Sequence, residues 1–164
     1  MSALATLKTA VGSVCDPEIQ VLTIAELGVL RHVSLDDGRP TVTITPTYVG
    51  CPAMDVIRED IADAARTAGF DDIAIVTVWS PAWTTDWLDE SARSKLAAAR
   101  IAPPAQRPRE SVLLQIGTAR SAGVQCPSCG SAETHETSRF GSTACKSLWT
   151  CAGCGDPFDH LKAH

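Results

Sequence analysis

Apolar residues recur with the period of a helix in two segments of the first seventy residues. Residues 2–14 place Leu and Val on one helical face, which predicts an opening helix that ends before the break at residues 16–18. Residues 52–68 show the same spacing, with acidic and basic residues on the other faces. Pro52 suits the first turn of this second helix, and Gly69 suits its end. We therefore predict two amphipathic helices.

Between and after these helices the pattern changes to that of strands. Residues 29–35 and 41–47 are rich in β-forming residues, and the sequence Asp-Asp-Gly at 36–38 is a good turn, so we predict a hairpin. Pro46 either limits the length of the second strand or places it at an edge. Residues 73–79 read as a third strand, buried on both faces.

A third helix is predicted over residues 85–100, which completes the order α-β-β-α-β-α. This order indicates an α+β fold, a small mixed-sheet domain with helices packed against it. We assign this domain to residues 1–100. Residues 101–124 contain three prolines and are interpreted as a linker, with room for a short strand that docks. Residues 125–164 form a separate C-terminal β-hairpin ribbon.

Composition narrows the classes of function. The 164 residues carry a formal net charge of −5, and residues 1–100 hold eight Lys/Arg against fourteen Asp/Glu. This acidity argues against a nucleic-acid partner. The first residues lack a secretory signal pattern, and no run approaches the length of a membrane span, so we expect a cytoplasmic protein without a membrane partner. Seven cysteines in a reducing compartment are better explained as metal ligands and thiols than as disulfides.

Four of these cysteines form two matched Cys-x-x-Cys-Gly sequences, with Cys126 and Cys129 in the first and Cys151 and Cys154 in the second. The 21 residues between the pairs suit a short hairpin that brings all four thiolates to one tetrahedral ion. Zinc is expected, although a rubredoxin-like iron site uses the same spacing. Because four thiolates close the coordination sphere, we expect a structural ion rather than a catalytic one.

The candidate thiol of the first domain is Cys51, immediately before the helix that starts at Pro52. A helix N-terminus stabilises an anion and can lower the pKa of a thiol. The alternative is a buried cysteine that only caps the helix. Asp16 and Glu18 would lie near Cys51 if the first loop folds over the sheet edge. That arrangement would suit transient binding of metal or a cluster better than hydrolysis, because no histidine stands in an obvious general-base position.

Other reactive side chains have plainer interpretations. Cys145 lies between the two cysteine pairs, where it is either a small buried hydrophobe or an accessory, exchangeable thiol favoured by Lys146 beside it. His135, His160 and His164 are expected to be solvated imidazoles, since four cysteines already satisfy one ion. Three indoles within residues 79–87 fit either the core or a docking patch for a partner.

Several short motifs occur together over nearly the whole chain. They are Asp16-Pro17-Glu18-Ile19, Leu22-Thr23-Ile24-Ala25-Glu26-Leu27-Gly28-Val29, Thr43-Ile44-Thr45-Pro46-Thr47-Tyr48, Gly50-Cys51-Pro52-Ala53, Pro81-Ala82-Trp83-Thr84-Thr85-Asp86-Trp87, Phe140-Gly141-Ser142-Thr143-Ala144-Cys145-Lys146 and the two cysteine pairs. This combination resembles the metal–sulfur cluster biosynthesis proteins. More narrowly, it is similar to the D-subunit family of phenylacetyl-CoA 1,2-epoxidase systems, in which an iron–sulfur assembly-like domain is fused to a zinc ribbon.

The resemblance implies a role in aerobic phenylacetate degradation as an accessory subunit that is not itself a catalyst. Such a subunit would help assemble or maintain an iron–sulfur or di-iron centre on the oxygenase and reductase subunits, which would be its partners. The family's cluster-handling cysteine falls on Cys51, with Asp16 and Glu18 in the Asp-Pro-Glu motif. The alternative is a rubredoxin-like electron carrier to the oxygenase, with iron in the four-cysteine site. The sequence leaves open whether two copies form a homodimer.

The chain departs from the family pattern at several positions. Ser80 stands where the family often has Asp, and Asp156 replaces Glu in the Glu-Pro-Phe motif. The last four residues lack the Phe and Cys of the usual ending, which weakens any mechanism that needs a terminal thiol. Cys15 is an addition without an interpretation from the sequence.

Overall fold

The computed structural model describes residues 2–36, 38–104 and 124–163, and it divides the chain into two compact units. The first unit holds Met1–Ala92 and the second holds Arg93–Ala163. The sequence predicts that the first domain ends at residue 100, eight residues later than this division. Part of the expected linker belongs to the second unit, because β4 (Ile101–Ala102) pairs with a strand of the ribbon. Residues 105–123 of that linker lie outside the described residues.

The sheet of the first unit has three strands in the order β1-β2-β3. Strands β1 (Leu30–Asp36) and β2 (Arg39–Ile44) pair antiparallel, which confirms the predicted hairpin, and β2 pairs parallel with β3 (Ala74–Thr77). Gly38 in the hairpin turn has a φ of +83°, a conformation that side chains disfavour. β2 is the central strand and ends two residues before Pro46, so the proline limits its length and does not mark an edge.

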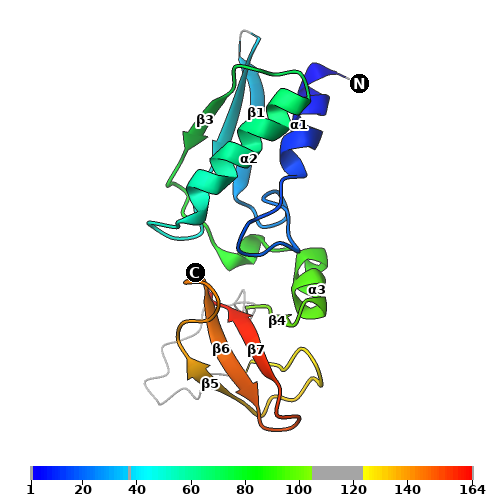
Figure 1. Cartoon of the computed structure of the whole chain (residues 1–164), viewed down its shortest axis with the longest axis vertical. Coiled ribbons are helices and arrows are strands. Elements are labelled where there is room, and N and C mark those ends of the chain that lie inside the picture. The colour runs from blue at the N-terminus through cyan, green and yellow to red at the C-terminus, as the bar shows by residue number, and fades with distance from the viewer. Residues whose placement is uncertain (1, 37, 105–123, 164) are drawn as a thin grey trace, which may run out of the picture. The chain divides into compact units, whose positions relative to one another are not determined.

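Helices α1 (Ala3–Gly12) and α2 (Ala53–Thr67) confirm the two amphipathic predictions. The Ser2 hydroxyl caps α1 by accepting a hydrogen bond from the Ala5 N–H at 3.2 Å. Figure 1 shows α2 crossing the face of the sheet with α1 beside it. No helix in the described ranges is long and apolar enough to span a bilayer.

The core of this unit lies between the helices and the sheet. Along β2, buried Val42 and Ile44 alternate with half-buried Thr41 and Thr43, so one face of the strand packs inward. The largest fully buried side chains of the unit are aliphatic: Leu7, Val11, Leu22, Ile24, Leu27, Val29, Val42, Ile44, Ile57 and Ile61. Each contributes about 1.5–3 kcal/mol when removed from water.

Two predicted elements of the first hundred residues differ in the structure. The prediction that the third strand is buried on both faces is wrong, because β3 is an edge strand and Val76 is 46% exposed. The single helix expected over 85–100 is instead a short 3₁₀ turn, η1 (Thr85–Trp87), followed by α3 (Glu90–Ala98). The break has a local cause, because the Asp89 carboxylate accepts from the Ala92 N–H at 2.7 Å and starts a new helix.

The second unit is a four-stranded ribbon in the order β4-β7-β6-β5. Strands β5 (Thr134–Ser138), β6 (Lys146–Cys151) and β7 (Pro157–Leu161) pair antiparallel in sequence, and β4 runs parallel to β7. A small cluster of buried side chains lies beside the thiols: Ala102, Cys126, Cys151 and Phe158, with Val124 and Trp149 packed against them. Two of the four buried members of this cluster are themselves cysteines.

Candidate metal centre and thiol site

The ribbon brings the four cysteines of the two matched pairs together. Their sulfur atoms all lie within 4.8 Å of one another, with 3.8 Å between Cys126 and Cys154 and 3.6 Å between Cys129 and Cys151. Zinc–thiolate bonds of about 2.3 Å in a tetrahedron separate neighbouring sulfurs by about 3.8 Å. The donor set and its spacing therefore fit a tetrathiolate zinc ion, with no place left for a water ligand.

The backbone of both turns is folded in the same way around these thiols. In each turn the N–H of the first cysteine donates to the carbonyl five residues later, Ser131 for Cys126 at 3.0 Å and Asp156 for Cys151 at 3.0 Å. The glycine that follows the second cysteine has a positive φ, +73° at Gly130 and +76° at Gly155. This is why a glycine must follow each pair: the chain enters a left-handed conformation there.

Backbone N–H groups also point at the sulfurs. The N–H of Ser131 donates to Cys129, and the N–H of Asp156 donates to Cys154, so the equivalence of the two turns extends to their thiols. The N–H of Cys154 is the main cause that lowers the pKa of Cys151 to about 7. For Cys154 the Asp156 N–H lowers the pKa, but burial and the three neighbouring thiols outweigh it and raise the pKa to about 12. Four adjacent thiols resist full ionisation without a cation, which a divalent metal supplies.

Cys51 lies in the turn before α2 and is half-buried. Its N–H donates to the Tyr48 carbonyl at 3.3 Å, and its sulfur accepts from the N–H of Ala53, the first residue of the helix. The side chains of Thr47 and Tyr48 also lower the pKa of the thiol. The thiol thus sits at the helix N-terminus, as the sequence predicts, within a small set of hydrogen-bond donors.

The N–H of Ala53 lowers the pKa of Cys51, as a helix N-terminus can, but the net shift of the pKa is upward. Burial raises the pKa of the thiol, and the charge of Glu18 raises it further, so together they outweigh the donors from Ala53, Thr47 and Tyr48. Cys51 is consequently protonated at neutral pH in the absence of a ligand. Binding of a metal ion or cluster would have to displace that proton.

The two carboxylates of the Asp-Pro-Glu motif have different surroundings. Asp16 is 5% exposed, and its carboxylate accepts from the N–H groups of Glu18 at 2.9 Å and Ile19 at 2.7 Å. These bonds fold the loop after α1, which gives Asp16 a structural task. The loop brings Glu18 close enough to Cys51 for its charge to act on the thiol. Of the two acidic candidates, Glu18 is therefore the one whose effect on Cys51 is seen.

Cys145 and His160 are both packed within the ribbon. Cys145 is buried and lies 3.0 Å from the Thr143 hydroxyl, whereas Lys146 is engaged with Asp159 at 3.8 Å. His135 is exposed, as expected, and His164 lies outside the described residues. His160 is not a solvated imidazole: it packs edge-on against Trp149, and burial lowers its pKa to about 4.

The three indoles divide between the two interpretations. Trp83 is 5% exposed and donates its Nε1–H to the Leu27 carbonyl at 2.8 Å, so it belongs to the core. Trp87 is half-buried beneath the Arg31 guanidinium, 3.8 Å from the ring centroid. Trp79 is 58% exposed. The run of tryptophans is neither a single core cluster nor a single surface patch.

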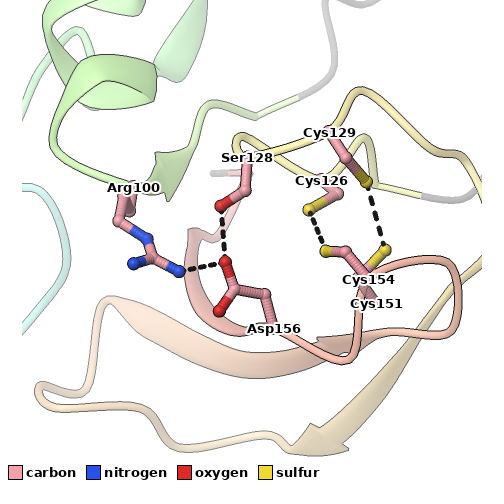
Figure 2. A network of polar contacts seen from close by, with 7 residues as sticks. All are labelled: Arg100, Cys126, Ser128, Cys129, Cys151, Cys154 and Asp156. Carbon is pink, nitrogen blue, oxygen red and sulfur yellow. Dashed lines mark hydrogen bonds and ion pairs between the residues drawn. The ribbon is translucent and has the colours of Figure 1, made fainter.

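Sequence reasoning missed a polar network beside the four thiols. Figure 2 shows the Asp156 carboxylate accepting from the Ser128 hydroxyl, at 2.7 Å, and from the Arg100 guanidinium. Ser128 is one of the two residues inside the first cysteine pair. The signal available in the sequence is the position of Asp156, five residues after Cys151, the same offset that separates Ser131 from Cys126.

Comparison with known proteins agrees with the division of the chain into two units. Residues 4–76 match the family described as iron-sulfur cluster assembly protein, and residues 115–162 match the family described as PaaD zinc beta ribbon domain. The crystal structure of a domain of unknown function, DUF59, from Bacillus anthracis superimposes with a TM-score of 0.53 at 27% identity, over 57% of this chain and 91% of that one. The fold and thiol cluster therefore define a cluster-assembly-type domain joined to a zinc ribbon.

Similarity over nearly the full length identifies the family. A protein of Escherichia coli (strain K12), provisionally named as the D-subunit of a 1,2-phenylacetyl-CoA epoxidase, is 42% identical over 147 residues, which is 90% of this chain and 85% of the relative. The Fe-S protein maturation auxiliary factor YitW of Bacillus subtilis (strain 168) is 35% identical over 89 residues, 53% of this chain and 86% of the relative. The chain belongs to the D-subunit family of phenylacetyl-CoA epoxidases.

Proposed function

We propose that this protein is an accessory maturation factor of a phenylacetyl-CoA epoxidase system in aerobic phenylacetate degradation. It would help assemble or maintain an iron–sulfur or di-iron centre on the oxygenase or reductase subunits, without catalysing the epoxidation itself. Two similarities support this proposal: the name of the relative from Escherichia coli, and that of the maturation factor from Bacillus subtilis.

The observation that carries the proposal is the separation of two kinds of thiol between the two units. The second unit gathers four thiols into a closed, tetrahedral set that suits a permanent ion. The first unit presents Cys51, a half-buried thiol with Glu18 nearby. A single cysteine with an acidic neighbour provides too few ligands for a stable site but suits brief contact with a metal or cluster as cargo.

In this proposal zinc occupies the four-cysteine site of Cys126, Cys129, Cys151 and Cys154 and stabilises the ribbon. Iron in the same site would make the protein an electron carrier, since the backbone geometry of the two turns suits either ion. Metal analysis and a visible spectrum of the purified protein separate the two, because zinc is colourless and redox-silent. None of the seven cysteines forms a disulfide, which is consistent with our proposal of a cytoplasmic location.

The decisive experiment replaces Cys51 with Ser in a strain that expresses the whole epoxidase system. Cys15→Ser is the matched control, because Cys15 is an exposed thiol of the same unit. The iron and sulfide content of the purified oxygenase and reductase is then measured, together with the zinc content of the variant. We expect Cys51→Ser to lower metal loading of a partner several-fold, with its own zinc retained.

The control should load its partners as the unaltered protein does. Fully loaded, fully active partners from the Cys51→Ser strain would refute a cargo role for this thiol. Equal losses from both variants would also contradict it, because they would show that any thiol change in this unit disturbs the system.

A further inference from the structure

The Asp156 residue makes four contacts around the cysteine cluster through three different groups. Its carbonyl accepts from the Cys151 N–H at 3.0 Å, and its N–H donates to the Cys154 sulfur. Its carboxylate accepts from the Ser128 hydroxyl at 2.7 Å and from the Arg100 guanidinium. Asp156 is not a metal ligand, yet it contacts two of the cysteines, Ser128 in the other cysteine turn, and Arg100 before β4.

The Ser128 contact joins the two cysteine turns. Ser128 lies between Cys126 and Cys129, whereas Asp156 follows Cys154 by two residues. The carboxylate thus links one turn to the other on the side of the cluster shown in Figure 2. The equivalent residue of the first turn, Ser131, repeats the backbone contacts of Asp156, but its hydroxyl accepts from the Glu133 N–H within its own segment. Of these two equivalent residues, Asp156 is the one whose side chain is seen to form a hydrogen bond with the other turn.

Charge explains why a cation stands beside Asp156. Four thiolates around a divalent zinc leave a net charge of −2, so a carboxylate close by adds unfavourable charge. The Arg100 guanidinium offsets that charge. Both side chains are partly exposed, at 56% for Arg100 and 33% for Asp156, so the ion pair alone would contribute little to stability. Its effect would come from holding Asp156 in place against the turns.

Arg100 makes this contact from a backbone conformation that is unfavourable for a residue with a side chain. Arg100 has a φ of +62° and is the only non-glycine residue with a positive φ in the described part of the chain. It stands between the end of α3 and β4, whose residues Ile101 and Ala102 pair with Asp159 and His160 of β7. A left-handed arginine at this point directs its side chain to Asp156, which is a reason for arginine where the backbone alone would favour glycine.

We propose that Asp156 is a positioning residue for the four-cysteine metal site, clamping the two cysteine turns through Ser128 and anchored by Arg100. The clamp slows loss of the ion because it keeps the two turns together when one thiolate dissociates from the metal. It also links metal occupancy to the docking of the segment around Arg100 and β4 onto the ribbon. This inference depends on the zinc site of the proposed function and goes beyond it in naming what holds that site closed.

The test measures the rate at which the full-length, zinc-loaded protein loses zinc to a chromophoric chelator. Three variants break the clamp at different points: Asp156→Ala, Ser128→Ala and Arg100→Gly. Glycine is chosen at position 100 because it accepts the positive φ, so that only the side-chain contact is lost. Asp159→Asn is the matched control, because Asp159 also accepts from a serine, Ser142 at 2.8 Å, and pairs with a cation, Lys146.

We expect Asp156→Ala to lose zinc about ten times faster than the unaltered protein, the lower end of the range for partners of metal ligands. Ser128→Ala and Arg100→Gly should each give a smaller increase, and combining Arg100→Gly with Asp156→Ala should add little, since both act through one carboxylate. Asp159→Asn should stay within about twofold of the unaltered rate. Far-ultraviolet circular dichroism of the zinc-loaded variants confirms that each begins folded.

A second readout reports on the geometry of the site itself. With cobalt in place of zinc, the visible bands of Asp156→Ala should shift from those of the unaltered protein, whereas those of Asp159→Asn should not. If release rates and cobalt spectra of the three clamp variants match those of Asp159→Asn, the inference is overturned. If the unaltered protein binds no metal, the zinc assignment of the proposed function fails instead, so the two failures are distinguishable.

Discussion

Different interactions stabilise the folds of the two units of this chain. Of the twelve largest fully buried side chains in the described part of the chain, ten lie in the first unit, on two helices, a sheet and the loop that joins α1 to β1. The second unit has a four-residue buried cluster, and two of its members are cysteines of the metal site. A small ribbon buries too little apolar surface to fold unaided. The comparison indicates that one unit is stabilised by hydrophobic burial and the other by its ion.

This difference agrees with the two tasks that the proposed function gives to the thiols. In the ribbon, cysteines are part of the core, so their chemistry is used up in holding the fold. In the first unit, Cys51 is not one of the buried core side chains, and our proposed function gives this thiol the task of transient binding. Under the proposed function, the chain combines a permanent metal site in one unit with a transient one in the other.

Removing the metal should have a large effect on the second unit and little effect on the first. Metal binding in small structural zinc sites contributes about 10–16 kcal/mol at neutral pH. We therefore expect chelation under reducing conditions to abolish amide-exchange protection in β5, β6 and β7 while α1, α2 and the first sheet keep theirs. Hydrogen exchange of the full-length chain, read by mass spectrometry, measures both units in one sample.

Two cysteine variants test whether this effect comes from the metal site. Cys151→Ser removes one of the four thiols and should behave like the chelated protein. Cys145→Ser alters a buried thiol of the same hairpin that lies outside the cluster, so it should retain zinc and protection. Persistent protection of the ribbon without any bound metal would contradict the dependence of the second unit on its ion.

The first unit should respond to loss of apolar volume instead. Ile61 on α2 is fully buried, and Ile61→Ala should lower the free energy of unfolding of this unit by about 2–5 kcal/mol. Val56 on the same helix is 44% exposed, and Val56→Ala should cost less than about 0.5 kcal/mol. Urea denaturation followed by exchange of α2 amides provides the measurement, and zinc content should be unchanged in both. Metal loss from Ile61→Ala would show that the two units do not depend on separate cores.

Much of this division could be predicted from the sequence. The helical periods of α1 and α2, the Asp-Asp-Gly turn and the matched cysteine pairs are local signals, and each depends on residues close together in the chain. The sequence predicts the third strand at the right place but predicts its burial wrongly. Its hydrophobic run does not reveal that β3 ends the sheet and leaves Val76 exposed.

Features that arise between distant segments could not be predicted. The pKa of Cys51 is raised because the loop with Glu18 folds against the turn before α2, and the sequence shows only the helix N-terminus. The contact of Arg100 with Asp156 joins residues far apart in the chain, so neither residue stands out by itself. The sequence predicts a surface position for His160. This prediction fails because the histidine packs against Trp149 only once the two strands that carry them are paired.

The smallest expected effect concerns His160, which tests whether anything besides the ion stabilises the ribbon. Burial lowers the pKa of His160 to about 4, against about 6.5 in an unfolded chain. Between these values the unfolded state binds more protons than the folded state. The stabilisation is therefore fully present above about pH 6.5 and is lost as the pH falls toward 4. At pH 5.5 the expected loss is about 1 kcal/mol.

His160→Gln removes this titration while leaving a side chain that can still bond to Ser147, which lies 3.4 Å from the imidazole Nδ1. The unaltered ribbon should lose about 1 kcal/mol more than the variant when the pH is lowered from about 7.5 to about 5.5, with zinc content checked at both values. Protonation of the cysteine ligands affects both proteins equally, so it cancels in the difference. The imidazole proton shifts of His160 should also stay constant over this range. A midpoint near the ordinary value of about 6.5 would show that the imidazole is solvated, and the second unit would then depend on its ion with even less help from packing than its four-residue cluster indicates.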